Sequence, residues 1–350
     1  MTSADPSQNW QSLKDLLTTP QKILITTHYK PDGDALGSSL GLYQLLIQLG
    51  HDVSVVVPSA FPDFLAWLPD TDKVINFEEN IPLGVQLIKE AEIVFCLDFN
   101  ALKRTHDLQN YLKQQCTAKM VMIDHHLNPD DFADFIMSKP SASSTCELIY
   151  EFAEMMGYLP LLNAAAANSL YTGLVTDTGR FKFALNPTTL KVAGALIAAG
   201  ADANTVNRWI FDSYTIDRFS LMQFVMAERT VVLPEFRSAY IYLSVADYQQ
   251  FNYKLGDNEG LVNYPLMMRD IVFSTLISET DDMIKFSFRS KGGFPVNEFS
   301  SKHFEGGGHK NASGGRSFKP FFRAIDYFND KLPKYKDQLW AEWNELEKGM

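Results

Sequence analysis

The first 200 or so residues alternate short apolar runs with stretches of helical spacing, and this alternation limits the fold more than any other feature. The run KILITT has the aliphatic and β-branched residues of a buried strand, and it leads into LGSSLGLYQLLIQLG, whose leucine spacing and closing Gly50 indicate a helix. The run EIVFCLDF is apolar almost throughout, as in a parallel strand with both faces buried. Repeated strand–helix–strand units predict a doubly wound, mainly parallel α/β sheet. The strand-like runs are residues 22–27, 52–59, 92–99 and 119–126.

The pattern changes after residue 230, where the sequence becomes rich in strand-like runs. The segment DIVFSTLISETDDMIKFSFRS indicates a hairpin whose polar turn is residues 279–282. We therefore predict a smaller α/β C-terminal domain with a mixed sheet, and a cleft between the two domains. The predicted bounds are 1–213 for the first domain, 214–230 for a connecting helix and 231–350 for the second domain.

The charge and the cysteine content exclude several classes of protein. The net charge is −11, whereas a protein that grips long nucleic acid through its backbone normally presents a basic surface. The chain has three widely separated cysteines and no CxxC pair, which argues against a disulfide framework or a thiolate zinc site. They are Cys96, Cys116 and Cys146. The polar N-terminus resembles no signal peptide, and no apolar run reaches about 18 residues. We expect a cytoplasmic protein with no membrane contact.

Histidine and aspartate side chains follow the predicted strands at the point where each strand ends. The first strand leads into the loop HYKPDGD, the third ends at an aspartate, the fourth ends in Asp-His-His, and a later helix ends in TDTG. The carboxyl ends of parallel strands meet at one edge of a sheet, where ligands bind. Each residue taken singly is as well explained as a cap or turn former. Jointly, they predict a metal site, with candidate ligands His28, Asp32, Asp34, Asp98, His125 and Asp177.

Four aspartates among the six candidates carry the charge that balances two divalent cations. Two metal ions about 3.5–4 Å apart can clamp a phosphoryl group and activate the water that attacks it. Asp98, alone at the end of a central strand, is the best candidate for a bridging carboxylate. Mixed imidazole and carboxylate ligands suit Mn²⁺, Fe²⁺, Co²⁺ or Zn²⁺. Asp124 is expected to hold a histidine ring in one tautomer, and His126 to face the substrate or the leaving oxygen.

A glycine-rich stretch near the C-terminus, GGGHKNASGG, has five glycines in ten residues. Glycine lets successive backbone N–H groups converge on an anion, although a flexible loop is the ordinary alternative. Arg289, upstream in FSFRS, can supply a bidentate phosphate contact. Arg104 could reach phosphate or lie on a helix face, and the helix face is the preferred interpretation. SASSTCE is interpreted as a helix cap at Ser144 or Thr145. The predicted substrate-binding residues are Arg289, Gly307, Gly308, His309, Asn311, Ser313 and Gly314.

These segments resemble the ordered motifs of the DHH phosphoesterase superfamily. The resemblance is carried by HYKPDGDALGS, the lone aspartate of VFCLDFN, the triplet Asp124-His125-His126, TDTGRF and GGGHKNASGG, and motif order and length resemble the nanoRNase/pAp phosphatase group. The resemblance implies a site for two metals, usually Mn²⁺, with Mg²⁺ or Co²⁺ as alternatives. It implies His28, Asp32 and Asp98 for one ion, Asp34, Asp98, His125 and Asp177 for the other, and His126 and Asp124 as catalytic residues.

The expected activity is hydrolysis of phosphate esters in short oligonucleotides of two to five nucleotides, in 3′-phosphoadenosine 5′-phosphate (pAp), or in both. A cyclic or linear dinucleotide phosphodiesterase is the nearest alternative, because it uses the same site. A pyrophosphatase or exopolyphosphatase fits the glycine-histidine motif less well, and a processive exonuclease would need a basic channel. A non-catalytic nucleotide sensor would need a broken ligand set. The preferred substrate and a homodimeric state are left open by the sequence.

Overall fold

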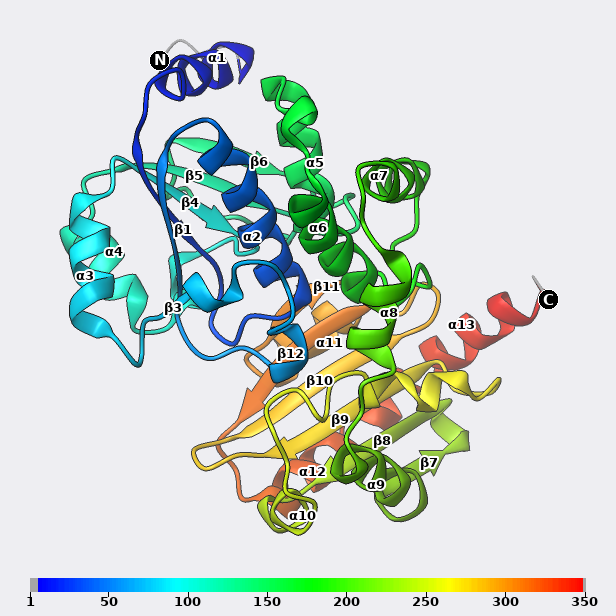
Figure 1. The fold of residues 1–350 in the computed structure, drawn as a ribbon. Coiled ribbons are helices and arrows are strands. Elements are labelled where there is room, and N and C mark those ends of the chain that lie inside the picture. The colour runs from blue at the N-terminus through cyan, green and yellow to red at the C-terminus, as the bar shows by residue number, and fades with distance from the viewer. Residues whose placement is uncertain (1–5, 349–350) are drawn as a thin grey trace, which may run out of the picture. The chain divides into compact units, whose positions relative to one another are not determined.

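The structure is a computed structural model that describes residues 6–348, and the chain divides into two compact units between Ser213 and Tyr214 (Figure 1). The first unit is built on a six-stranded sheet in which every neighbouring pair of strands is parallel. The predicted doubly wound fold is confirmed. The strands are β1 (Lys22–Thr26), β2 (Asp52–Val57), β3 (Ile75–Asn76), β4 (Ile93–Leu97), β5 (Lys119–Asp124) and β6 (Phe135–Ser138).

The strand order, β3-β2-β1-β4-β5-β6, reverses direction between β1 and β4. In open α/β sheets such a reversal leaves a crevice at the carboxyl ends of the two central strands, because their crossovers leave in opposite directions. His28 follows β1 and Asp98 follows β4 directly. The two short edge strands, β3 and β6, were not predicted, since two and four residues give too little pattern.

Helices cover both faces of this sheet (Figure 1). Phe95 and Leu97 of β4 pack into the core beneath α2, α5 and α6, whereas Val94 and Cys96 pack into the core beneath α3 and α4. This alternation explains why the strand is apolar throughout. The helices of the unit are α1 (Pro6–Leu16), α2 (Gly33–Gln48), α3 (Ile81–Glu90), α4 (Leu108–Gln115), α5 (Thr145–Met156), α6 (Ala164–Asp177), α7 (Pro187–Ala198) and α8 (Ala203–Phe211).

Glycines set the close approach of α2 to its neighbours. A Cβ atom at Gly37 would clash with the carbonyl oxygen of Ser169 on α6. A Cβ atom at Gly173 would clash with Cys146 Sγ and lie 2.9 Å from both the Cα and the Oδ1 atoms of Asp34. The absence of side chains at these positions therefore holds α2, with Asp34 in its first turn, tightly between α5 and α6.

The second unit has a mixed six-stranded sheet in the order β11-β12-β10-β9-β8-β7, with β8 parallel to β9 and all other neighbours antiparallel. The predicted hairpin is formed by β9 and β10, and phenylalanines on one face of the sheet, including Phe286 and Phe288, pack into the core. The strands are β7 (Thr230–Leu233), β8 (Ser238–Leu243), β9 (Phe273–Glu279), β10 (Ile284–Ser290), β11 (Gly307–His309) and β12 (Ala312–Ser317).

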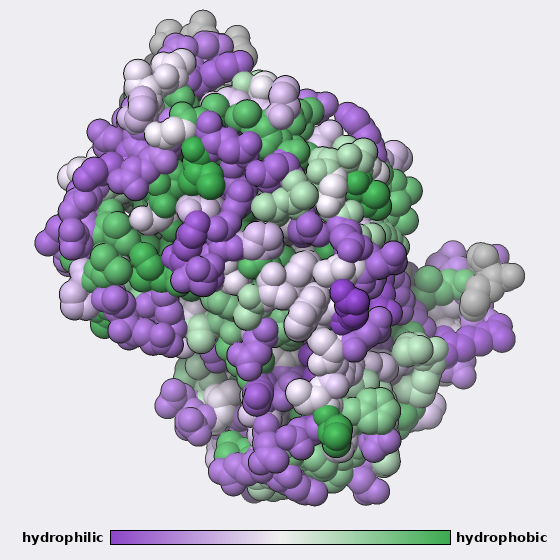
Figure 2. Space-filling view, viewed as in Figure 1, coloured by the Kyte–Doolittle hydropathy of each residue, from purple (hydrophilic) through white to green (hydrophobic). Residues whose placement is uncertain are grey.

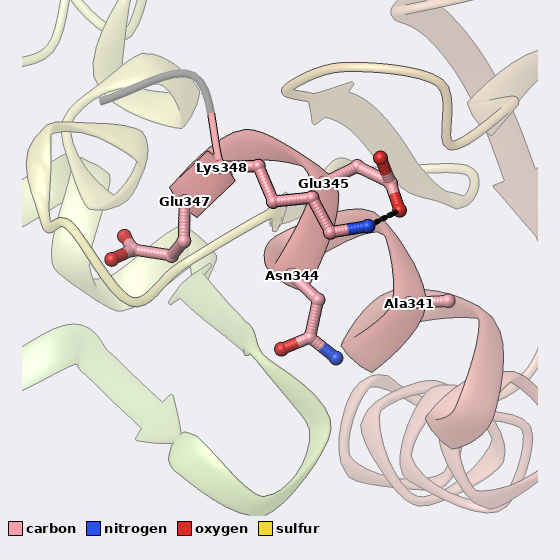
Figure 3. A pocket seen from close by; sticks show the side chains of 5 residues that line it. All are labelled: Ala341, Asn344, Glu345, Glu347 and Lys348. Atoms are coloured by element: carbon pink, nitrogen blue, oxygen red, sulfur yellow. Dashed lines mark hydrogen bonds and ion pairs between the residues drawn. The ribbon is translucent and has the colours of Figure 1, made fainter.

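The predicted connecting helix is α9 (Ile216–Phe224), which continues as a π-helical turn over Val225–Arg229. The other helices of the unit are α10 (Val245–Gln250), α11 (Val296–His303), α12 (Phe321–Asn329) and α13 (Lys336–Lys348). An open depression of about 610 Å³ lies on α13 (Figure 3). Its lining residues are Ala341, Asn344, Glu345, Glu347 and Lys348, none of which was predicted to act in a functional site.

Hydrophilic residues cover most of the face seen in Figure 2, with hydrophobic areas between them. Among residues 6–348, no helix combines the length and the apolar character needed to cross a membrane.

Candidate metal centre

The loop after β1 and the end of β4 bring one histidine and two aspartates together. His28 Nε2 lies 3.8 Å from Asp32 Oδ1 and 3.3 Å from Asp98 Oδ2. The other ring nitrogen, Nδ1, is 3.0 Å from the carbonyl oxygen of Tyr29, and a carbonyl can only accept, so Nδ1 carries hydrogen. The ring is therefore oriented with Nε2 toward the two carboxylates, as in histidines that bind metals.

A second group forms where α2, the end of β5 and the end of α6 meet. His125 Nε2 lies 3.8 Å from Asp34 Oδ2 and 3.3 Å from Asp177 Oδ2. His125 Nδ1 is 3.3 Å from the carbonyl oxygen of Ala142, so this ring is oriented in the same way. Asp177 is the last residue of α6 and keeps about a third of its side chain exposed.

Asp98 joins the two groups, because its two carboxylate oxygens face different histidines. Oδ2 is 3.3 Å from His28 Nε2, and Oδ1 is 3.6 Å from His125 Nε2. The Asp98 backbone has a φ of +62°, an uncommon conformation for a residue other than glycine. Such strain is typical of functional positions, and here it turns the side chain from the end of β4 into the space between the groups.

The start of α5 holds the carboxylates of both groups. The backbone N–H groups of Thr145 and Cys146 donate to Asp34 over 2.6 Å and 2.8 Å, and the Thr145 hydroxyl donates to Asp98 Oδ1 over 2.9 Å. The helix cap is Ser144, whose hydroxyl accepts from the N–H of Glu147, as predicted for this segment. Sequence reasoning missed Thr145 as a site residue. Its position, one residue inside a capped helix beside the strand ends, was the available signal.

Asp124 and His126 form a pair beside Asp98. His126 Nδ1 is 2.7 Å from Asp124 Oδ1, and the His126 backbone N–H donates to Asp124 Oδ2 over 3.0 Å. Asp124 is fully buried at the end of β5. The carboxylate therefore fixes the tautomer of the ring and leaves His126 Nε2 as the nitrogen that can exchange a proton with another group.

The electrostatics of the site reflect this crowding of carboxylates. Burial opposes the charge on His28, but hydrogen bonds and the charges of Asp32 and Asp98 outweigh it and raise its pKa to about 10. Burial also opposes the charge on His125, yet the surrounding aspartates raise its pKa to about 9. Burial and the nearby carboxylates raise the pKa of Asp34 well above its usual range.

The donor set fits divalent metal ions. Two imidazole nitrogens and the oxygens of four aspartates face a common space, and each histidine is oriented through its other nitrogen. Clustered carboxylates of this kind are stable only with protons or cations between them. The two groups, His28–Asp32–Asp98 and Asp34–His125–Asp177, can each hold one ion, with Asp98 shared between them.

In the second unit, GGGHKNASGG forms the hairpin of β11 and β12 and is not a flexible loop. Gly308 has a φ of +140°, and a Cβ atom there would lie 2.7 Å from the carbonyl oxygen of Ala312, so only glycine fits. The Asn311 amide donates to the Ser290 hydroxyl and the Gly292 carbonyl oxygen, both over 2.9 Å. The Ser313 hydroxyl donates to the carbonyl oxygen of Val296 over 2.8 Å. These two side chains therefore hold the hairpin in place.

Strand register places Arg289 and His309 on the same face of the second sheet. Ala312 of β12 pairs with Arg289 on one side and with His309 on the other, and directly paired residues project to the same face. The Cα atoms of Arg289 and His309 are therefore two strand spacings apart, roughly 10 Å, and only the small side chain of Ala312 lies between them. Gly307 and Gly314 pair in the next row on that face, where they leave the backbone uncovered.

Two domain families account for most of the chain. Residues 22–174 match the DHH family, N-terminal domain, and residues 238–332 match the DHHA1 domain. The bifunctional oligoribonuclease and PAP phosphatase NrnA of Bacillus subtilis is 30% identical over 295 residues, which cover 83% of this chain and 88% of that protein. The chain belongs to the DHH phosphoesterase family. It is a hydrolase that acts on phosphoester bonds.

Other relatives also match this chain over most of its length. The NrnA protein of Thermus thermophilus is 30% identical over 296 residues, which cover 83% of each chain. A crystal structure of an exopolyphosphatase-related protein from Bacteroides fragilis superposes with a TM-score of 0.89 at 37% identity, covering 97% of this chain and 99% of that one. Both units of the fold are therefore shared with a solved protein.

Metal binding to this DHH phosphoesterase is expected to release protons and to tighten as pH rises. The pKa values of about 10 for His28 and about 9 for His125 mean that both rings are protonated at neutral pH without metal, and a metal must displace both protons. The charged rings stabilise the metal-free fold fully below about pH 6.5, the ordinary histidine pKa. That stabilisation is lost as pH rises through about 9 to 10.

Calorimetric titration of Mn²⁺ in buffers of different ionisation enthalpy measures this release. We expect up to two protons at pH 7.5, about one fewer in His28→Asn, and no change in His51→Gln, a histidine outside the cluster. An affinity that stays constant between pH 6.5 and 8.5 would contradict the prediction.

Replacing Thr145 by valine is expected to weaken metal binding by roughly 10- to 100-fold, the usual effect of losing a group that orients a ligand. Valine keeps the shape and the backbone N–H to Asp34 but removes the hydroxyl that donates to Asp98. Thr145→Ser should retain most of the affinity. Thr189→Val is the matched control, because Thr189 donates to the buried carboxylate of Glu147 outside the cluster. If both valine variants bind Mn²⁺ equally well, Thr145 does not orient Asp98.

Proposed function

We propose that this protein is a two-metal phosphoesterase that hydrolyses short oligonucleotides of two to five nucleotides and also converts pAp to AMP and phosphate. The observation that carries the proposal is the position of Asp98, whose two oxygens face two separate histidine–carboxylate groups. The NrnA relatives, named for oligoribonuclease and PAP phosphatase activity, cover most of the chain and support the choice of substrate.

His28, Asp32 and Asp98 would hold one metal ion, and Asp34, Asp98, His125 and Asp177 the other. When bound, a pair of divalent ions supplies charge for the phosphoryl oxygens and lowers the pKa of water at the site. Mn²⁺ suits the mixture of imidazole and carboxylate ligands, and Mg²⁺ and Co²⁺ are the alternatives to test.

The protein's own groups then position the substrate and move protons. His126, fixed by Asp124 through Nδ1, presents Nε2 to donate a proton to the leaving oxygen. The start of α5 keeps Asp34 and Asp98 in place while charge shifts at phosphorus. These roles need no movement of the backbone, since each side chain is already held by a hydrogen bond.

The second unit would bind the terminal phosphate of the substrate. Arg289 and His309 project from the same face of its sheet, and Gly307 and Gly314 leave backbone uncovered in the next row of that face. We assign Gly308 to the subsite through the close approach of β11 to β12 that it allows. We assign Asn311 and Ser313 to the same subsite through their hold on the hairpin. A net charge of −11 favours short substrates over long polymers. A cytoplasmic location and a homodimer stay predictions.

A substrate panel with Mn²⁺, Mg²⁺ or Co²⁺ tests the proposal. It should include pAp, oligonucleotides of two to five nucleotides, a 20-nucleotide strand, cyclic dinucleotides and polyphosphate. We expect the highest kcat/KM for dinucleotides to pentanucleotides, release of phosphate from pAp, and little turnover of the long strand. Preference for cyclic dinucleotides or polyphosphate would replace this function with one of those activities. Tight nucleotide binding without turnover with any metal would indicate a sensor.

A further inference from the structure

Arg104 lies close to the candidate metal centre and has a free guanidinium. It belongs to a 3₁₀ turn, Leu102–Thr105, that begins four residues after Asp98. The N–H of Tyr29, which follows the ligand His28, donates to the carbonyl oxygen of Arg104 over 2.8 Å, so the turn is fastened to the loop after β1. Within residues 6–348 the guanidinium makes no hydrogen bond and no ion pair.

The side chain of Arg104 is half-buried on the turn that follows Asp98. An arginine in such a position, with no carboxylate partner among the described residues, is placed to accept an anion. This position favours the phosphate contact over the helix-face interpretation of Arg104.

Two aromatic rings stand next to this arginine. The rings of Tyr29 and His106 are stacked, with centroids 4.7 Å apart and an interplanar angle of 28°. The His106 side chain is more than half exposed, so the outer face of the pair is accessible. The spacing leaves no room for a third ring between the two, and a planar ligand would have to stack on the outside.

The backbone at His106 is strained, with a φ of +51° and a ψ of −127°. Few residues other than glycine adopt this region, and such strain persists mainly where function requires the side chain. A carboxylate flanks the pair, since Asp107 Oδ1 lies 3.5 Å from His106 Nδ1. Because this charge repels phosphate, the rings suit a neutral base, and the anion belongs at Arg104.

We propose that Arg104 and the Tyr29–His106 ring pair form a nucleotide subsite of the first unit, in which Arg104 binds a substrate phosphate and the rings stack on one nucleobase. The inference rests on the proposed function and specifies which part of the substrate the first unit recognises. Stacking of this kind tolerates any base, so the subsite explains binding of mixed sequences.

The test compares a dinucleotide, pApA, with two analogues that each lack one base. For Tyr29→Leu and His106→Gly we expect kcat/KM on pApA to fall roughly 5- to 100-fold, the scale of one stacked base. On the analogue that lacks the stacked base the same variants should match the wild-type protein. Arg104→Met should lose activity on pApA and on both analogues alike, because the phosphate is common to all three.

Matched controls separate the subsite from general damage. Trp209→Leu also removes an exposed stacked ring, the partner of Trp67, and Lys103→Met removes the neighbouring charge, and neither should change kcat/KM. His106→Gly relieves strain, so its melting temperature should be no lower than that of the wild type even as pApA turnover falls. Mn²⁺ affinity should be unchanged in all five variants, which excludes an effect through the metal ligands.

The two proposals fail in different ways. If the wild-type protein does not hydrolyse pApA, the proposed function is wrong and the subsite falls with it. If the wild-type protein is active, the subsite alone is overturned when the ring variants lose as much on both analogues as on pApA, or when Arg104→Met behaves like Lys103→Met. Should Tyr29→Leu fail to fold, His106→Gly decides the outcome.

Discussion

Asp98→Asn is expected to lower hydrolysis by about a thousandfold or more while leaving the fold intact, because charge that stabilises the transition state would be lost from both halves of the centre. Asparagine keeps the size of the side chain and tolerates the left-handed backbone that Asp98 adopts at a φ of +62°. It replaces one anionic oxygen with an amide, so it cannot face both His28 and His125 as a carboxylate does. Hydrolysis of pApA and calorimetric counting of Mn²⁺ ions measure the effect.

The matched control is Asp70→Asn. Asp70 also has a left-handed backbone, with a φ of +64°, but it pairs with Lys73 outside the cluster. This control should keep full activity and both metal ions, and both variants should melt close to the wild-type temperature. Full activity in Asp98→Asn would show that the two groups do not share this carboxylate.

Gly173→Ala is expected to destabilise the first unit by about 1–3 kcal/mol, the usual range for overpacking a dense core. The new methyl group would clash with Cys146 Sγ on α5 and press on the backbone of α2 at Asp34. Since Asp34 is held by the N–H groups of Thr145 and Cys146, a shift of α2 would also weaken metal binding. Chemical denaturation and Mn²⁺ titration measure the two effects.

Two further variants show whether crowding is the cause. Gly194 lies within α7 with open space around it, so Gly194→Ala should be neutral or stabilise the protein by up to about 1 kcal/mol. In the Cys146→Ala background the clash with sulfur disappears, and Gly173→Ala should then cost less stability than it does in the wild type. A Gly173→Ala protein with wild-type stability and metal affinity would mean that the helices are not packed as tightly as the glycines indicate.

Several site features were readable from residue types and spacing alone. Histidines and aspartates at the ends of predicted parallel strands had to meet at one edge, because all strands of such a sheet run the same way. The structure brings His28, Asp32, Asp98, His125 and Asp177 together at that edge, with Asp34 in the first turn of α2. Their roles as metal ligands stay predictions until an ion is bound.

Other features depend on contacts that have no signature along the chain. Thr145 looks like a helix-capping residue in sequence, and only the packing of α5 against α2 and β4 shows that its hydroxyl meets Asp98. The stacking of Tyr29 on His106 joins residues 77 positions apart through a backbone hydrogen bond to Arg104. The hairpin register that puts Arg289 and His309 on one face is likewise a property of strand pairing.

Local sequence therefore determined the type of each main element, the parallel first sheet and the residue types gathered at its edge, because hydrophobic periodicity and turn chemistry act over a few residues. Tertiary structure alone decided the strand order, which oxygen of Asp98 faces which histidine, and which neutral side chains orient the charged ones. These depend on distances of 3 to 4 Å between distant segments, and such distances are set by how whole elements pack.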